Sequence, residues 1–94
     1  MLFEWDPNKN SKNIDKHGID FMDAITIFDD DDRVEAADGR HQYGEERIQV
    51  IGEAKPGVLL VVYTWRHGAT IRRIISARTA SRKERKLYFS MKNL

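Results

Sequence analysis

One run of six apolar residues, Val58 to Tyr63, constrains the fold of this 94-residue chain more than any other feature. Every position of the run is apolar, whereas a strand with one face in water alternates apolar and polar residues. The run is also far too short to cross a bilayer. We therefore expect residues 58–63 to form a central strand that is covered on both faces, in a soluble protein without a membrane partner.

Extended segments separated by turn signals surround this central strand. Residues 33–37 and 47–51 precede it, and residues 70–78 follow it after the turn sequence His67-Gly68. Such short spacings are typical of antiparallel pairing, so we expect an antiparallel sheet of about four strands. Residues 2–5 alternate weakly and read as a further short strand.

Capping signals predict two helices in the N-terminal part of the chain. Asp6 can cap a helix that starts at Pro7, and Gly18 can end that helix in the left-handed conformation. Asp20 begins a second helix, in which apolar residues between 21 and 28 recur at spacings of three and four. The acidic run at residues 29–32 follows, and we place it in a solvated loop because acids at a helix C-terminus oppose the helix dipole.

A capping box, Ser81-x-x-Glu84, predicts a C-terminal helix in which Leu87, Tyr88 and Met91 share a face. The expected fold class is therefore α+β, with two N-terminal helices, the sheet and a last helix. The chain contains no repeat, low-complexity segment or linker, so residues 1–94 are expected to form a single domain.

The chain has no cysteine, which excludes disulfides, thiolate catalysis and zinc sites with cysteine ligands. Its first residues have neither a basic region nor a long apolar stretch, so we expect no signal peptide and a cytoplasmic location. The sequence also lacks a glycine-rich phosphate loop, a nucleophile elbow, zinc-ligand spacing and a calcium loop. No metal or cofactor is expected.

Charge is distributed unevenly along the chain, although the net charge is only +1. Residues 1–46 contain 5 Lys or Arg against 13 Asp or Glu, and residues 47–94 contain 11 against 2. This asymmetry predicts a basic face that attracts a polyanion, most simply RNA. The alternative is that the two halves interleave in space and neutralise each other as ordinary surface ion pairs.

Metal-independent RNA cleavage requires a base for the ribose 2′-hydroxyl, cations for the phosphorane and an acid for the leaving 5′-oxygen. The chain offers residues of each type. The candidate bases and acids are His17, His41, His67, Glu46, Glu84 and Tyr88, and the candidate phosphate clamps are Arg47 and Arg78.

Each of these residues also has a structural reading. His17 can close its helix through the dipole, His41 and His67 lie near turns, Glu84 can serve as the capping-box partner, and Tyr88 can pack in the core. Trp5 and Trp65 can stack on bases or pack in the core, and the arginines can pair with acids. Residue types alone therefore predict a basic binding face and leave catalysis open.

Strand geometry limits how these groups can converge. Adjacent residues of a strand point to opposite faces, so Glu46 and Arg47 cannot both enter one site unless the strand end redirects one of them. In a regular strand over residues 71–78, Arg72, Ile74, Ser76 and Arg78 would share one face, and Arg73 would lie on the other.

The chain as a whole resembles the BrnT family of type II toxins, which are small ribonucleases with a RelE-like fold. The matching elements are Phe3-x-Trp5-Asp6 with Lys9 and Asn13, Lys16-His17-Gly18-Ile19, Phe21 with Ala24, Glu46-Arg47, Ile51-Gly52, Arg73-Ile74-Ile75-Ser76-Ala77-Arg78, Ala80, Glu84-Arg85 and Tyr88. They cover about nine-tenths of the chain in the right order, and the combined pattern is far more specific than any single piece.

The resemblance implies an endoribonuclease that slows growth and is neutralised by a cognate antitoxin. In this family the antitoxin, BrnA, carries a ribbon-helix-helix DNA-binding region, and operator DNA is bound only through the complex. The residues that the resemblance suggests for the active surface are His17, Glu46, Arg47, Arg78 and Tyr88. Further contacts with the RNA backbone would come from Arg66, Arg72, Arg73 and Arg85.

Two other functions fit the same residues. One is a non-catalytic module that uses the basic face to bind nucleic acid or an acidic protein. The other is a structural or regulatory protein whose basic half packs on an acidic helix of a partner. RNA cleavage in EDTA separates the toxin from both, and binding that survives RNase treatment identifies the last.

Overall fold

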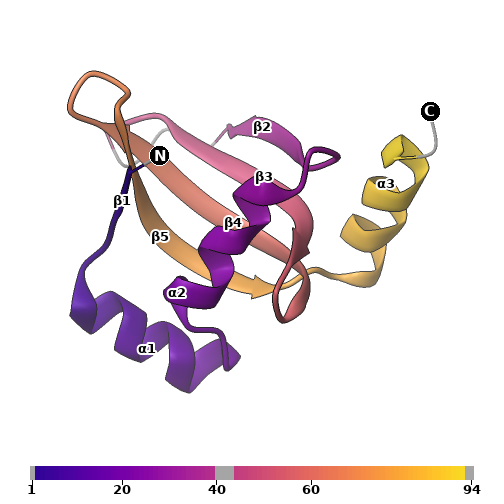
Figure 1. The fold of residues 1–94 in the computed structure, drawn as a ribbon, viewed down its shortest axis with the longest axis horizontal. Coiled ribbons are helices and arrows are strands. Elements are labelled where there is room, and N and C mark those ends of the chain that lie inside the picture. The colour runs from indigo at the N-terminus through magenta and orange to yellow at the C-terminus, as the bar shows by residue number, and fades with distance from the viewer. Residues whose placement is uncertain (1, 40–43, 93–94) are drawn as a thin grey trace.

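The computed structural model describes residues 2–39 and 44–92, and it has an α+β fold as expected (Figure 1). The elements in chain order are β1 (Leu2–Glu4), α1 (Pro7–His17), α2 (Phe21–Ala24), the 3₁₀ helix η1 (Ile25–Asp29), β2 (Val34–Asp38), β3 (Arg47–Ala54), β4 (Gly57–Arg66), β5 (Ile71–Thr79) and α3 (Arg82–Lys92). Within these residues, no helix combines the length and the apolar character that a membrane span needs.

The sheet has the strand order β1-β5-β4-β3-β2. Strands β2 to β5 pair antiparallel, as predicted for the four main strands. The sheet is nevertheless not wholly antiparallel, contrary to the expectation, because β1 pairs parallel with β5 from Leu2 opposite Ile71 to Glu4 opposite Arg73. The sheet among the described residues is therefore mixed and has five strands.

Strand β4 is buried on both faces, which confirms the interpretation of the apolar run. On one face, which we call the core face, Leu59, Val61 and Tyr63 pack with residues of α2 and η1. On the other face, Leu60 and Val62 pack in a smaller cluster that includes Tyr88 of α3. Figure 1 shows α2 and η1 crossing one face of the sheet, with α1 and α3 on opposite sides of the view.

The helix termini follow the predicted capping residues. The Asp6 side chain accepts a hydrogen bond from the Asn8 N–H, Pro7 is the first helical residue, and Gly18 ends α1 with a φ of 71°. Asp20 caps α2 by accepting from the Met22 N–H. The predicted second helix is only partly α-helical, because it tightens into η1 after Ala24.

A bulge in β5 overturns the predicted alternation of its side chains. Val62 lies opposite Ser76 and Tyr63 lies opposite Ile74, so Ile75 is an extra residue that shifts the register. The extra residue reverses the sides on which the later residues lie. Arg72 and Ile74 therefore share the core face with Tyr63, while Ser76 and Arg78 share the opposite face with Val62 and Leu60.

Candidate nucleic-acid interface

Four arginines share the face of the sheet opposite the core face, and we call this surface the arginine face. Its members are Arg47, Arg66, Arg73 and Arg78. Arg73 lies opposite Thr64 and Arg78 opposite Leu60, while Arg47 and Arg66 lie on this side by strand alternation. Arg47 and Arg78 are two strands apart and offset by four residues, which is about 13 Å along the strand direction. They are therefore placed to bind different phosphates of one nucleic-acid strand.

Two glutamates hold three of these guanidinium groups. Glu45 lies 2.5 Å from Nη1 of Arg66 and 3.8 Å from Nη2 of Arg47. The hydrogen bond from Arg66 is the main cause that keeps the pKa of Glu45 below its ordinary value. Glu4 lies 2.6 Å from Nη1 of Arg73, which Glu4 faces across the β1–β5 pairing.

Arg78 makes a two-point contact with Glu84. Its Nη1 and Nη2 donate to the two carboxylate oxygens at 2.7 and 2.9 Å. These hydrogen bonds lower the pKa of Glu84 to about 2 and raise that of Arg78. Glu84 also completes the predicted capping box, because it accepts from the Ser81 N–H while the Ser81 hydroxyl accepts from the Glu84 N–H. A carboxyl with so low a pKa is a poor base at neutral pH.

Arg72, predicted as a contact to the RNA backbone, occupies the core face instead. Only 5% of its surface is exposed. Its guanidinium carbon lies 4.4 Å from the ring centroid of Phe28, 4.6 Å from that of Trp65 and 5.3 Å from that of Tyr63. Such contacts between a guanidinium and aromatic rings stabilise a fold, and the enclosed cation has little surface to offer a phosphate.

Glu46 precedes β3 and lies at the end of the sheet. It lines a pocket of about 180 Å³ with Trp65 and Ile48, which belong to the core face, and with Thr64 and Arg66 of the arginine face. Its backbone carbonyl accepts from the Thr64 hydroxyl, and its exposed side chain has no ion pair among the described residues. Glu46 is thus an available carboxylate beside the arginine face rather than on it.

Tyr88 is fully buried, and its hydroxyl donates to Oδ2 of Asp30 at 2.5 Å. Burial is the main cause that raises the pKa of its hydroxyl, and the hydrogen bond to Asp30 adds to it. A phenol that is enclosed and hard to ionise is badly placed to exchange protons with RNA. The packing interpretation of Tyr88 therefore fits the geometry better than the catalytic one.

The predicted histidines lie in different places. His17, half-buried at the end of α1, lines a pocket of about 250 Å³ with three lysines and the bulge of β5. His67 lies in the β4–β5 turn with a φ of 53°, and its Nε2 is 3.8 Å from Glu4. His41 falls outside the described residues. Of the two described histidines, His17 is the one placed in a pocket next to basic groups.

The remaining aromatic and basic candidates divide between core and surface. Trp5 and Trp65 pack against the core, Trp5 edge-on to Phe21 and Trp65 edge-on to Tyr63. Arg85 is exposed on α3, with its guanidinium 5.8 Å from the ring of Phe89. Neither tryptophan is thus placed as an open stacking platform for bases.

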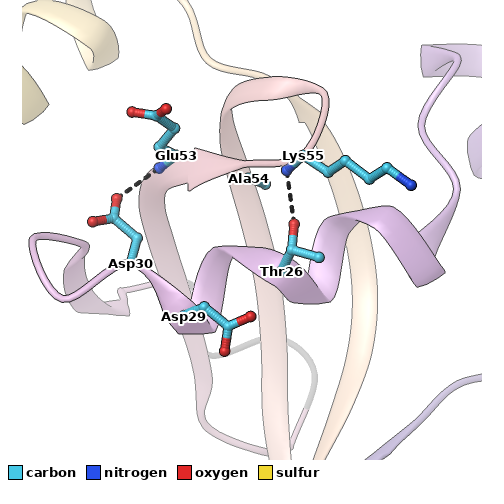
Figure 2. Close-up of a pocket in the computed structure, with 6 residues that line it drawn as sticks. All are labelled: Thr26, Asp29, Asp30, Glu53, Ala54 and Lys55. Atoms are coloured by element: carbon cyan, nitrogen blue, oxygen red, sulfur yellow. Dashed lines mark hydrogen bonds between the residues drawn. The ribbon is translucent and has the colours of Figure 1, made fainter.

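An acidic pocket lies at the end of β3 that is far from Arg47 and Arg66. It has a volume of about 430 Å³ and is lined by Thr26, Asp29, Asp30, Glu53, Ala54 and Lys55 (Figure 2). Asp30 accepts from the Glu53 N–H and the Thr26 hydroxyl accepts from the Lys55 N–H, which ties η1 to the β3–β4 hairpin. Carboxylates repel phosphate, so this pocket is a structural junction rather than a candidate RNA site.

The sequence alone did not predict three features of the structure. Glu45 stood unnoticed beside Glu46, and nothing in the pattern marked it as the partner of two arginines. Asp30 was grouped with the solvated acidic run, yet it accepts hydrogen bonds from Tyr88, Glu53 and Asp32. Lys9, Lys12 and Lys16 could have been found, because their spacing puts them on one side of a helix.

Comparisons with known proteins agree with the resemblance seen in the sequence. A family model described as "Ribonuclease toxin, BrnT, of type II toxin-antitoxin system" matches residues 5–84. A search of curated proteins finds no match for the chain.

Proposed function

The chain belongs to the BrnT family of ribonuclease toxins of type II toxin–antitoxin systems, and on this premise we propose that it is a metal-independent endoribonuclease that acts on cellular RNA from its arginine face. Membership implies an antitoxin partner. The proposal adds the reaction, the surface and the kind of antitoxin.

The observation that carries the proposal is the gathering of Arg47, Arg66, Arg73 and Arg78 on one face of the sheet. Three carboxylates, those of Glu4, Glu45 and Glu84, hold these guanidinium groups in defined positions. A phosphodiester offers the same pairing geometry as a carboxylate, so it can take the place of the glutamate oxygens. The face is thus preorganised for a polyanion.

The proposed reaction is intramolecular transesterification. The ribose 2′-oxygen loses its proton to a base and attacks the neighbouring phosphorus, and the 5′-oxygen leaves with the electron pair of its bond and takes up a proton from water. The products end in a 2′,3′-cyclic phosphate and a 5′-hydroxyl. Arg47 and Arg78 bind different phosphates of the RNA, one of them the reacting phosphate, whose developing charge its arginine stabilises, and Glu46 or His17 serves as the base.

The proposed partner is a BrnA-like antitoxin with a ribbon-helix-helix region. It neutralises the toxin in the cytoplasm, and the complex, rather than the toxin alone, binds operator DNA. Because phosphate must reach the arginine face, an antitoxin that covers this face would block the substrate. The basic face is also a suitable surface for an acidic segment of that partner.

The test is cleavage of a defined RNA by the purified chain in EDTA. We expect products with a cyclic phosphate end, no cleavage when the 2′-hydroxyls carry methyl groups, and a loss of about a hundredfold or more for Arg47→Gln and Arg78→Gln. Arg82→Gln, an exposed change of the same charge on α3, should cut normally. Intact RNA after incubation with folded, RNA-binding protein would refute the enzyme.

A non-catalytic binding module remains the second candidate, and a specific observation favours it. Two of the groups considered for proton transfer are engaged structurally, Tyr88 with Asp30 and Glu84 with Arg78. On this alternative, methylated and unmodified RNA bind equally and neither is cut.

A further inference from the structure

The side of helix α1 that packs on the sheet is polar, which is unusual for a surface helix. Apart from Pro7 its one apolar residue is Ile14, which is 40% exposed, while the residue it buries is Asn13. A surface helix normally packs an apolar stripe on the core. Here the stripe is replaced by one amide with lysines on either side of it, so hydrophobic packing does not explain the sequence of α1.

Asn13 fixes α1 to the open edge of β5. Strand β1 pairs with β5 only from Ile71 to Arg73. Farther along, the Asn13 side chain accepts from the Ala77 N–H at 3.1 Å and donates to the Ala77 carbonyl at 2.8 Å, and it also donates to the Ile19 carbonyl. The Asn13 amide thus makes hydrogen bonds with β5 that a neighbouring strand would otherwise make. It also fixes the position of the residues beside it on the helix.

Those residues line a basic pocket. It has a volume of about 250 Å³, and its lining residues are Lys9, Lys12, Asn13, Lys16, His17, Ile75 and Ser76. No carboxylate lines it. The lysines occupy positions i, i+3 and i+7 of α1, which places them on one side of the helix. Within residues 2–39 and 44–92, no ion pair involves any of the three, in contrast to the arginines of the arginine face.

The pocket adjoins the arginine face. Ser76 lies on that face between Arg73 and Arg78, and Ile75 is the extra residue of the bulge. Lys9 is also near enough to Glu45 to contribute to the lowering of its pKa, after the larger effect of Arg66. An RNA strand that lies along the arginine face at β5 would therefore pass directly over the lysines.

We propose that the pocket formed by Lys9, Lys12, Lys16 and Ser76 between α1 and β5 binds a backbone phosphate of the RNA strand, next to the arginine face. This inference rests on the proposed function, and it extends the surface along which that function places the RNA. Three neighbouring ammonium groups, none of them in an ion pair with a described carboxylate, repel one another, and a phosphate relieves this repulsion while accepting hydrogen bonds from them. The Ser76 hydroxyl can donate as well. Lys9, Lys12, Lys16 and Ser76 hold the RNA strand and do not take part in bond cleavage, which the proposed function assigns to other groups.

The experiment measures binding of a single-stranded oligonucleotide with 2′-O-methyl groups, which cannot be cut by 2′-hydroxyl attack. The triple variant Lys9→Gln, Lys12→Gln, Lys16→Gln is compared with the triple variant Arg82→Gln, Lys83→Gln, Lys86→Gln on the exposed side of α3. Both remove three positive charges from exposed helical positions. We expect the α1 variant to bind roughly tenfold more weakly than the α3 variant and to reduce the slope of log K against log salt by about 1.

The outcomes separate this inference from the proposed function. Equal weakening by both triple variants, or no binding by the unaltered chain, would overturn the pocket. A selective loss of binding in the α1 variant supports it even if unmodified RNA is never cut, in which case only the enzyme proposal fails. Thermal unfolding of both variants checks the fold, and because Gln removes repulsion between the lysines, the α1 variant should be at least as stable as the unaltered chain.

Discussion

Glu84 joins two elements through one carboxylate, because it caps α3 and binds Arg78 of β5. Its pKa falls from 4.5 to about 2, chiefly through the hydrogen bonds from Arg78. A carboxyl whose pKa is lowered by folding stabilises the fold above its unfolded-state pKa and loses that contribution as the pH falls through the folded-state value. The contribution should therefore disappear between about pH 5 and pH 2.

Replacing Glu84 tests this pH dependence. Between pH 7 and pH 2.5, the unfolding free energy of Glu84→Gln should fall by roughly 1–2 kcal/mol less than that of the unaltered chain. This figure allows for solvent screening of a partly exposed pair. The measurement is the free energy of urea unfolding at pH 7, 4 and 2.5. Glu53→Gln, at an exposed position of β3, should keep the original pH profile. An equally steep acid loss in Glu84→Gln would contradict the interpretation.

A substitution of Arg72 tests the structural role that its surroundings indicate. Arg72→Met keeps much of the side-chain volume but removes the charge that lies over three rings, so it should cost about 2 kcal/mol of stability. Oligonucleotide affinity should change less than twofold at a temperature where the variant is folded. Arg82→Met, on the surface of α3, is the control for charge. Lost binding with unchanged stability would instead make Arg72 a phosphate contact.

Among the elements, α3 is attached to the molecule by few side chains. Tyr88 is its one buried residue, while Leu87, Phe89 and Met91 are between 41% and 48% exposed. The hydroxyl of Tyr88 reaches Asp30 at the end of η1. Burial opposes ionisation of Asp30, but hydrogen bonds from Tyr88 and from the N–H groups of Glu53 and Asp32 outweigh it and keep its pKa low. Tyr88 and Asp30 thus connect α3 to the opposite side of the sheet.

Tyr88→Phe should loosen this attachment without touching the reaction. Loss of a hydrogen bond to a carboxylate costs about 1.5–3 kcal/mol, and amide hydrogen exchange should accelerate first within α3. Single-turnover cleavage by the folded variant should stay within about threefold of the unaltered rate, whereas loss of a general acid would cost a hundredfold or more. Phe89→Leu, at the neighbouring exposed position, is the control for packing. A large loss of rate with normal stability would restore Tyr88 as a catalytic residue.

For the whole molecule, local signals predicted the elements well but not their junctions. The apolar run of β4, the caps at Asp6, Asp20 and Ser81, and the C-terminal Gly18 each depend on neighbouring residues, so they could be read from the sequence. The parallel pairing of β1 joins residues about 70 positions apart and leaves no local trace.

The candidate site was harder to predict for the same reason. The bulge at Ile75 decides which arginines share a face, yet the residues around it alternate normally in the sequence. Charge by halves was also a poor guide to faces. Glu4 and Glu45, from the acidic half, hold arginines of the basic half, as the interleaving alternative expected. Lys9, Lys12 and Lys16, also from the acidic half, form a basic pocket.

The electrostatic field of the arginine face follows from this interleaving, and Glu45 is the residue that tests it. Its carboxylate neutralises part of the charge of Arg47 and Arg66, and its lowered pKa keeps it ionised at neutral pH. Glu45→Gln should therefore strengthen binding of a methylated oligonucleotide by about threefold at low salt, with the gain shrinking as salt is added.

The control for Glu45→Gln is Glu53→Gln, which makes the same change of net charge at the other end of β3, six residues or about 20 Å from Arg47. If the field beside Arg47 and Arg66 draws the RNA, Glu45→Gln should keep the larger gain at physiological salt, where an exposed charge is screened beyond about 8 Å. Equal gains in affinity from both variants would mean that net charge alone explains the effect. Weaker binding in Glu45→Gln would mean that the carboxylate orders the two guanidinium groups more than it competes with phosphate.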